Sequence, residues 1–173
     1  MAAGFRAYIA ASLDGYIADS DGSIAWLKPF DAIDYGFDEF MEHIGTVVMG
    51  RTTYEHLHAM GHWPHGDKRC IVVTSRSMET APDNVEPWLG DLAQLVAELK
   101  ASPDGDIWVA GGAKALRAFL DLGAIGHFDL FIMPVLLGKG RPLFLPSDRG
   151  DRMTLLGAKT YINGVVRLSY VVG

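Results

Sequence analysis

The sequence is poor in cysteine, has no excess of positive charge and contains no long apolar run, and each shortage excludes a class of protein. Cys70 is the only cysteine among 173 residues, so neither an internal disulfide nor a cluster of thiolate metal ligands can form. We therefore expect a reducing, cytoplasmic environment. The formal net charge of −6 argues against a general nucleic-acid-binding protein, which needs a basic face to neutralise phosphates.

Membrane and targeting segments are also missing. No stretch approaches the roughly 18 consecutive apolar residues of a membrane-spanning helix, so we expect no membrane partner. Residues 1–8 contain one arginine and no long apolar run before a cleavage site, which predicts no signal peptide. The length and the 49% hydrophobic content are typical of a globular domain, and we expect residues 1–173 to form a single one.

The apolar residues follow strand and helix periodicities in alternation. We expect strands at 5–11, 46–49, 71–73, 107–110 and 128–133, and helices at 34–44, 52–58, 92–99 and 113–120, the third of them capped by Asp91. Strands at 153–159 and 165–172 flank Asn163-Gly164, which is typical of a hairpin turn. Residues 12–29 show no periodicity and are expected to form a lid loop. The pattern predicts an α/β fold with a central mixed, mostly parallel sheet and an antiparallel C-terminal hairpin.

Glycine, hydroxyl and arginine side chains follow three of the expected strands. The sets are Gly50, Arg51, Thr52 and Thr53; Ser75 and Arg76; and Gly111, Gly112 and Ala113. Ligands bind beyond the carboxyl ends of parallel strands, where glycines admit a ligand to the backbone and helix N-termini attract anions. Guanidinium groups match phosphate geometry. We therefore expect an extended anionic ligand, with a pyrophosphate at Gly111-Gly112 and a second phosphate between Arg51 and Arg76.

Each set alone has a simpler interpretation, because a Gly-Gly pair often makes only a tight turn and an arginine after a strand is usually a solvated charge. Their occurrence at three strand ends favours binding. The common dinucleotide fold is not indicated, since no Gly-x-Gly-x-x-Gly follows the first strand and no Walker lysine loop is present. Four histidines lie between 56 and 65, but their spacing fits no zinc motif, so we expect no metal site.

Five sequence blocks carry a family resemblance. They are Ala-Ser-Leu-Asp-Gly-Tyr-Ile-Ala at 11–18, Val-Met-Gly-Arg-Thr-Thr-Tyr-Glu at 48–55, Val-Thr-Ser-Arg at 73–76, Ile-Trp-Val-Ala-Gly-Gly at 107–112, and Met-Pro-Val-Leu-Leu-Gly at 133–138 with Pro-Leu-Phe at 142–144. In this order they resemble the dihydrofolate-reductase superfamily. More narrowly, they resemble the C-terminal reductase domain of the bifunctional riboflavin-biosynthesis deaminase/reductase. The second and fourth blocks are the specific ones.

The resemblance implies a three-layer fold with NADPH lying across the sheet. By analogy with the family, the adenosine end and its 2′-phosphate would lie at Gly50, Arg51, Thr52, Thr53, Ser75 and Arg76, the pyrophosphate at Gly111, Gly112 and Ala113, and the nicotinamide at Ala10, Ile17 and Ala18. The implied protein is an NADPH-dependent oxidoreductase acting on a small pyrimidine or pterin. The deaminase motifs, His-x-Glu and Pro-Cys-x-x-Cys, are absent, which indicates a stand-alone reductase. Whether it forms a homodimer is left open.

A buried carboxylate would suit the amidine-like edge of a pyrimidine or pterin ring. On a helix over 34–44, Asp34 lies closest to the apolar stripe centred on Phe37 and Met41. It also stands about where dihydrofolate reductases place their carboxylate. We therefore predict that Asp34 is catalytic. The alternative is an acidic residue of the first helical turn that only favours the helix macrodipole.

Three functions stay open at this point. The first is reduction of a ribosylaminopyrimidine of the 5-amino-6-(5-phosphoribosylamino)uracil type, whose phosphate would need cations such as Lys139 and Arg141. The second is reduction of dihydrofolate, whose glutamate tail would need Lys68 or Arg69. The third is a non-catalytic NADPH-binding module, which would bind the cofactor without oxidising it.

Overall fold

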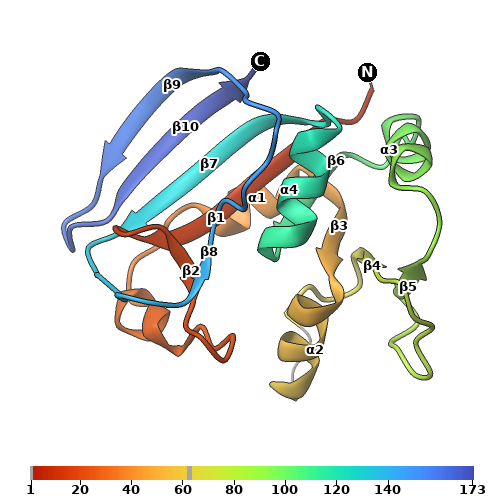
Figure 1. The fold of residues 1–173 in the computed structure, drawn as a ribbon, viewed down its shortest axis with the longest axis horizontal. Coiled ribbons are helices and arrows are strands. Elements are labelled where there is room, and N and C mark those ends of the chain that lie inside the picture. The colour runs from red at the N-terminus through yellow and green to blue at the C-terminus, as the bar shows by residue number, and fades with distance from the viewer. Residues whose placement is uncertain (1, 62–63) are drawn as a thin grey trace.

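The computed structural model describes residues 2–61 and 64–173, which fold around one large sheet (Figure 1). Its strands are β1 (Phe5–Ser12), β3 (Ile44–Gly50), β4 (Arg69–Val73), β5 (Val85–Trp88), β6 (Asp106–Gly111), β7 (Ile125–Met133), β9 (Met153–Thr160) and β10 (Val166–Val172). The helices are α1 (Phe37–Glu42), α2 (Arg51–Ala59), α3 (Leu92–Lys100), α4 (Ala113–Asp121) and the 3-10 helix η1 (Ala25–Phe30). A second, two-stranded sheet pairs β2 (Tyr16–Ala18) with β8 (Arg141–Pro142).

The strand order in the large sheet is β5-β4-β3-β6-β1-β7-β10-β9. Neighbouring strands are parallel from β5 to β7, whereas β10 runs antiparallel to both β7 and β9. This confirms the predicted mixed, mostly parallel sheet with its antiparallel C-terminal hairpin. The carboxyl ends of β4, β3, β6 and β1 therefore lie next to one another along one edge of the molecule.

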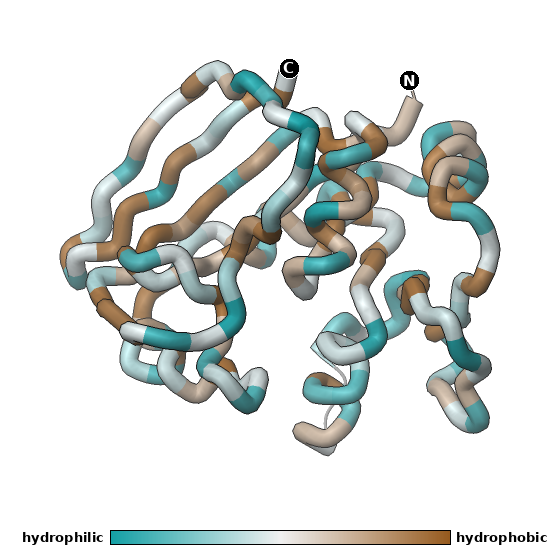
Figure 2. Tube along the Cα trace, in the orientation of Figure 1, coloured by the Kyte–Doolittle hydropathy of each residue, from teal (hydrophilic) through white to brown (hydrophobic). Residues whose placement is uncertain are grey.

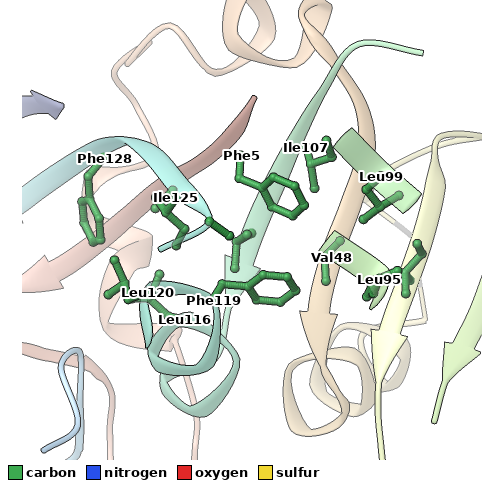
Figure 3. Packing of buried hydrophobic residues seen from close by; sticks show 14 of the residues in the cluster. Phe5, Val48, Leu95, Leu99, Ile107, Leu116, Phe119, Leu120, Ile125 and Phe128 are labelled. Atoms are coloured by element: carbon green, nitrogen blue, oxygen red, sulfur yellow. The ribbon is translucent and has the colours of Figure 1, made fainter. Parts of the chain in front are cut away.

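The two faces of the sheet bury different sets of residues because side chains alternate along each strand. On one face, Phe5 packs with Phe119 of α4 and with residues of α3 such as Leu99 (Figure 3). On the other face, Tyr8 of β1 stacks on Phe40 of α1 with ring centroids 4.3 Å apart. Helices therefore cover both faces, and Figure 2 shows apolar residues along the strands and polar residues in many surface loops.

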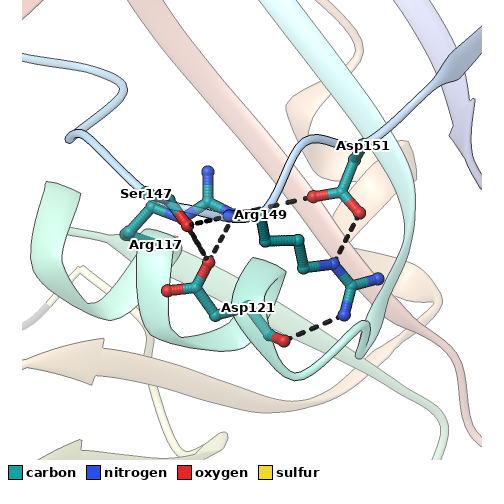
Figure 4. A network of polar contacts seen from close by, with 5 residues as sticks. All are labelled: Arg117, Asp121, Ser147, Arg149 and Asp151. Carbon is teal, nitrogen blue, oxygen red and sulfur yellow. Dashed lines mark hydrogen bonds and ion pairs between the residues drawn. The ribbon is translucent and has the colours of Figure 1, made fainter.

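A polar network fixes the carboxyl end of α4 to the segment before β9 (Figure 4). The Arg117 side chain pairs with Asp121 at 2.7 Å, and Asp121 also accepts a hydrogen bond from the Ser147 hydroxyl at 2.7 Å. Arg149 donates to the Asp121 carbonyl and pairs with Asp151. The network lies at the end of α4 that is remote from Gly112, so we assign it a structural role.

Three expectations about local structure are corrected. The lid segment 12–29 is not structureless, because β2 pairs with β8 more than a hundred residues away and residues 25–30 form a 3-10 helix. The helix expected over 34–44 is only α1, because Gly36 adopts φ of +80° immediately before it and residue 44 already begins β3. Strand β5 was not predicted, since Pro87 interrupts its pattern, but an edge strand tolerates proline.

Neither a membrane span nor a metal site is found in the described ranges. There, no helix is both long enough and apolar enough to cross a bilayer. The same residues contain no group of three or more His, Cys, Asp or Glu side chains arranged to hold a metal ion. One of the four clustered histidines, His62, lies outside the described residues.

Candidate active site

The structure brings together the three residue sets that follow strands. Gly50 at the end of β3 pairs with Val73 at the end of β4, and Met49 pairs with Gly111 at the end of β6. Strand β1 is the next neighbour on the far side of β6. The glycines, hydroxyls and arginines singled out in the sequence therefore share one edge of the sheet, beside the lid that follows β1.

Two helix N-termini converge at this edge. Helix α2 begins directly after Gly50 and α4 directly after Gly112, and neither first turn receives a side-chain cap from the described residues. A β-carbon on Gly112 would lie 3.3 Å from the Thr53 hydroxyl, and one on Gly50 would lie 3.8 Å from the Gly112 nitrogen. Uncapped N–H groups and the positive ends of two helix dipoles thus face the same small space, which suits a pyrophosphate.

Gly111 has a conformation that only glycine adopts easily. Its φ is +113°, and its peptide bond to Gly112 is cis. A β-carbon on Gly111 would meet only the Ile9 side chain, at 3.7 Å. The requirement for glycine at this position therefore comes from the backbone conformation, which turns the chain from β6 into the start of α4.

The Arg51 guanidinium forms its contacts within the protein. Its guanidinium pairs with Glu55 at 2.7 Å and donates to the Thr74 hydroxyl and to the carbonyls of Arg76 and Ser77 at 3.2–3.3 Å. The hydrogen bond from Arg51 holds the pKa of the Glu55 carboxyl below its ordinary value. Arg51 therefore fixes the turn after β4, whereas the Arg76 side chain is exposed. A ligand phosphate would meet Arg76 more directly than the sequence alone indicates.

An open pocket of about 630 Å³ lies beside this turn. Its lining residues come from α2 and from the chain after β4: Arg51, Tyr54, Glu55, Arg76, Ser77, Met78, Glu79 and Thr80. The pocket is wide enough for a nucleoside group. Two arginines and two glutamates share its wall, so its charge is mixed rather than uniformly positive.

The lid follows β1 and is attached to the chain on both sides of β8. Leu13 donates its N–H to the Val135 carbonyl, and Leu143 donates to the Gly15 carbonyl. The tip of the lid reaches α2, since a β-carbon on Gly22 would collide with the His56 ring and the Arg141 guanidinium. The lid segment therefore spans from β1 to α2 along this edge of the sheet.

The three residues expected near a nicotinamide sit on this lid and on β1. Ala10 of β1 and Ile17 of β2 are half-buried, and Ala18 is buried with 6% of its surface exposed. Gly140 packs against the Ala18 carbonyl so closely that any side chain there would collide with it. The arrangement places the lid residues against the 138–143 segment, a contact that no local sequence pattern showed.

Asp34 does not have the surroundings that its predicted role assumed. It lies before α1 rather than on it, it is exposed, and its carboxylate accepts a hydrogen bond from the Gly36 N–H at 2.8 Å. The helical-phase argument for Asp34 is therefore wrong. Its second carboxylate oxygen makes no hydrogen bond with the described residues, and the catalytic role stays a prediction.

Sequence reasoning missed a group of tyrosines behind Asp34. Burial raises the pKa of the Tyr8 hydroxyl, which donates to the Tyr35 carbonyl at 2.9 Å. The Tyr35 hydroxyl donates to the Phe30 carbonyl and accepts from the Asn163 amide at 2.7 Å. Asn163 was singled out as a turn residue, and the turn also ties the segment after η1 to the C-terminal hairpin. Only the tertiary structure shows this second contact.

The cations considered for a substrate's anionic end differ in their surroundings. Lys68 donates to the Ile44 carbonyl at 2.7 Å, and Arg69 pairs with Glu86 at 2.6 Å and with Glu98 at 3.6 Å. Lys139 instead lines a shallow pocket with 19–21 of the lid and Leu137. Lys68 and Arg69 are thus used within the fold, whereas Lys139 faces solvent near the lid.

Comparisons with known proteins identify similar sequences and a similar fold. The family model described as the RibD C-terminal domain matches residues 6–167. The uncharacterized protein YwjB of Bacillus subtilis (strain 168) is 38% identical over 167 residues, covering 95% of both chains. A crystal structure of a Shewanella sp. PV-4 protein named for riboflavin biosynthesis has a TM-score of 0.89 at 27% identity, covering 100% of this chain and 99% of that one.

A dihydrofolate reductase supports the fold assignment alone. The enzyme from Enterococcus faecalis, solved with NADP(H), has a TM-score of 0.67 at 18% identity and covers 98% of this chain and 96% of its own. The three-layer arrangement predicted from the sequence blocks is therefore confirmed. Since the family match extends over nearly the whole described fold, the chain belongs to the RibD C-terminal domain family.

Proposed function

We propose that the protein is an NADPH-dependent reductase of the riboflavin-biosynthesis type, acting on a pyrimidine such as 5-amino-6-(5-phosphoribosylamino)uracil. One observation carries the proposal: two uncapped helix N-termini converge at the carboxyl edge of the sheet, beside a pocket that contains the exposed Arg76. An elongated dinucleotide carrying a pyrophosphate and a terminal phosphate matches that arrangement. Membership of the RibD C-terminal domain family supports the same reaction class.

Each part of the proposed cofactor would contact different residues along this edge. The N–H groups of Gly112 and Ala113 would hold the pyrophosphate, together with the Thr52 and Thr53 hydroxyls at the start of α2. Arg76 and Ser75 would hold the 2′-phosphate on the turn that Arg51 fixes. Ala10, Ile17 and Ala18 would bound the nicotinamide. The bound cofactor supplies the hydride, and the protein orients it and excludes water.

Dihydrofolate reduction is less well supported, because Lys68 and Arg69 are engaged with the fold's own carbonyl and carboxylates. The test is the rate of NADPH oxidation with the ribosylaminopyrimidine phosphate and with dihydrofolate as separate substrates. We expect turnover of the first and little of the second. Efficient turnover of dihydrofolate alone would reverse the ranking. Tight NADPH binding without turnover of any pyrimidine or pterin would indicate the non-catalytic module instead.

Asp34 is proposed to contact the ring edge of the substrate through its second carboxylate oxygen. Because the side chain is exposed, solvent weakens its hydrogen bonds, and Asp34→Asn should lower kcat/KM by about fivefold. NADPH affinity should hardly change, since the adenosine pocket lies across β3 and β4. Steady-state kinetics and cofactor titration measure the two quantities.

Asp38→Asn is the matched control, because Asp38 is also exposed and lies only four residues further on, in the first turn of α1. Its kcat/KM should equal that of the unmodified protein. Equal losses in both variants would remove Asp34 from the substrate site. The proton would then come from water or from the substrate itself.

A further inference from the structure

The junction between the lid and the loop after β7 contains one carboxylate with an unusual set of partners. Asp14 accepts hydrogen bonds from the Ser12 hydroxyl at 2.6 Å, the Leu137 N–H at 3.1 Å and the Gly138 N–H at 2.8 Å. The two backbone donors are more than 120 residues away in sequence, so this contact is not a local turn motif. The Ser12 hydroxyl also holds the pKa of Asp14 below its ordinary value, which keeps the carboxylate ionised.

The two leucines next to the Asp14 contacts bury little apolar surface. Leu13, beside Asp14, is 64% exposed, and Leu136, beside Leu137, is 70% exposed. Strand β2 has only three residues and pairs with a β8 of two, and so short a ladder is marginal alone. Burial of Ala18 and Leu143 holds β2 and the chain after β8, whereas the part of the lid next to β1 is held by polar contacts. Those of Asp14 involve an ionised acceptor, but the side chain is exposed and solvent weakens them.

The lid residues that are proposed to lie against the nicotinamide come soon after Asp14 in the sequence. Ile17 and Ala18 lie three and four positions after Asp14, on the strand whose pairing partner is the 141–142 segment. A loosened junction would let β2 move while leaving the turn of Arg51 and Arg76 in place, because that turn is built by contacts within α2 and the chain after β4. The adenosine end of the proposed site therefore has contacts of its own, and the lid reaches α2 through its tip at Gly22.

We infer that Asp14 is a positioning residue that fixes the lid over the reacting end of the cofactor by accepting the Leu137 and Gly138 N–H groups. The inference rests on the proposed function and adds a residue that acts on hydride transfer without touching substrate. The Leu-Asp-Gly-Tyr-Ile and Pro-Val-Leu-Leu-Gly segments form the two sides of this junction.

The test compares NADPH with 2′,5′-ADP, which carries only the adenosine end of the cofactor. Asp14→Asn keeps one acceptor oxygen, and Asp14→Ala keeps none. We expect NADPH affinity and kcat to fall about fivefold in Asp14→Asn, the scale of one weakened hydrogen bond, and further in Asp14→Ala. The affinity for 2′,5′-ADP should be unchanged in both. Asp148→Asn, an exposed change beside the remote α4 network, is the control and should alter nothing.

The outcomes separate this inference from the proposed function. If the unmodified protein binds neither NADPH nor 2′,5′-ADP, the proposed function fails, and the inference with it. If the unmodified protein binds both, and Asp14→Ala lowers the two affinities equally or lowers neither, only the role of Asp14 is overturned. A selective loss for NADPH, graded from asparagine to alanine, supports it. Thermal melting of each variant identifies any general loss of structure, which would count against a positioning role.

Discussion

Arg76→Ala is expected to weaken NADPH binding by about tenfold to a hundredfold while leaving NADH binding nearly unchanged. The two cofactors differ only in the 2′-phosphate, and a hydrogen bond to a charged group contributes roughly 1.5–3 kcal/mol. The Arg76 guanidinium is exposed at the pocket, so solvent competition favours the lower end of this range. Fluorescence titration of both cofactors against the variant measures the difference.

Arg51→Ala is the informative comparison. Because Arg51 holds the Arg76 and Ser77 carbonyls and the Thr74 hydroxyl, its loss should disturb the whole turn and weaken both cofactors. It should also lower the melting temperature, which Arg76→Ala should not. Had the two arginines simply shared one phosphate, the two variants would behave alike. Identical NADPH-selective losses would therefore contradict the division of roles that the structure indicates.

Among these single substitutions, Gly111→Ala should cause the largest combined loss of stability and cofactor affinity. A side chain at φ of +113° imposes strain of about 1–3 kcal/mol, whatever space surrounds it. Relief of that strain would move the start of α4, and with it the N–H groups proposed to hold the pyrophosphate. We expect a lower melting temperature and NADPH and NADH affinities that both fall by about tenfold to a hundredfold.

Gly126→Ala provides the control. Gly126 lies near the start of β7, it is exposed, its φ is outside the positive range, and a β-carbon there would meet nothing within 4 Å. Melting and cofactor affinity should stay close to those of the unmodified protein. If Gly111→Ala proved equally harmless, the backbone conformation after β6 would not be what the site requires.

The sequence predicted the framework well because periodicity and turn chemistry are local. The Asn163-Gly164 hairpin and the Asp91 cap, whose carboxylate accepts from Ala93, both formed as expected. The glycine, hydroxyl and arginine residues after β3, β4 and β6 lie together because parallel strands place their carboxyl ends at the same edge of a sheet. The alternation of strands and helices in the sequence already predicted that parallel arrangement.

The predictions from the sequence failed in two ways. One failure concerned a local backbone conformation, and the other concerned contacts made by the tertiary structure. Apolar spacing extended a helix back to Asp34, but Gly36 adopts a left-handed conformation and the helix starts after it. The spacing could not show that this glycine ends the regular pattern. Asp14 accepts from an N–H group more than 120 residues away, and Arg51 donates to backbone carbonyls after β4. Neither kind of contact can be predicted from composition or from the periodicity of apolar residues.

The position of β1 in the sheet has a consequence for how the chain folds. Both neighbours of this first strand, β6 and β7, come from beyond residue 105. Strand β1 can therefore form its hydrogen bonds only with segments that are far away in sequence. Such non-local pairing is slow, and until it occurs both edges of β1 are open to other chains. During synthesis, the N-terminal strand must wait for more than half of the protein to emerge. A chain stalled before β6 would present an unpaired apolar strand and would be prone to aggregate.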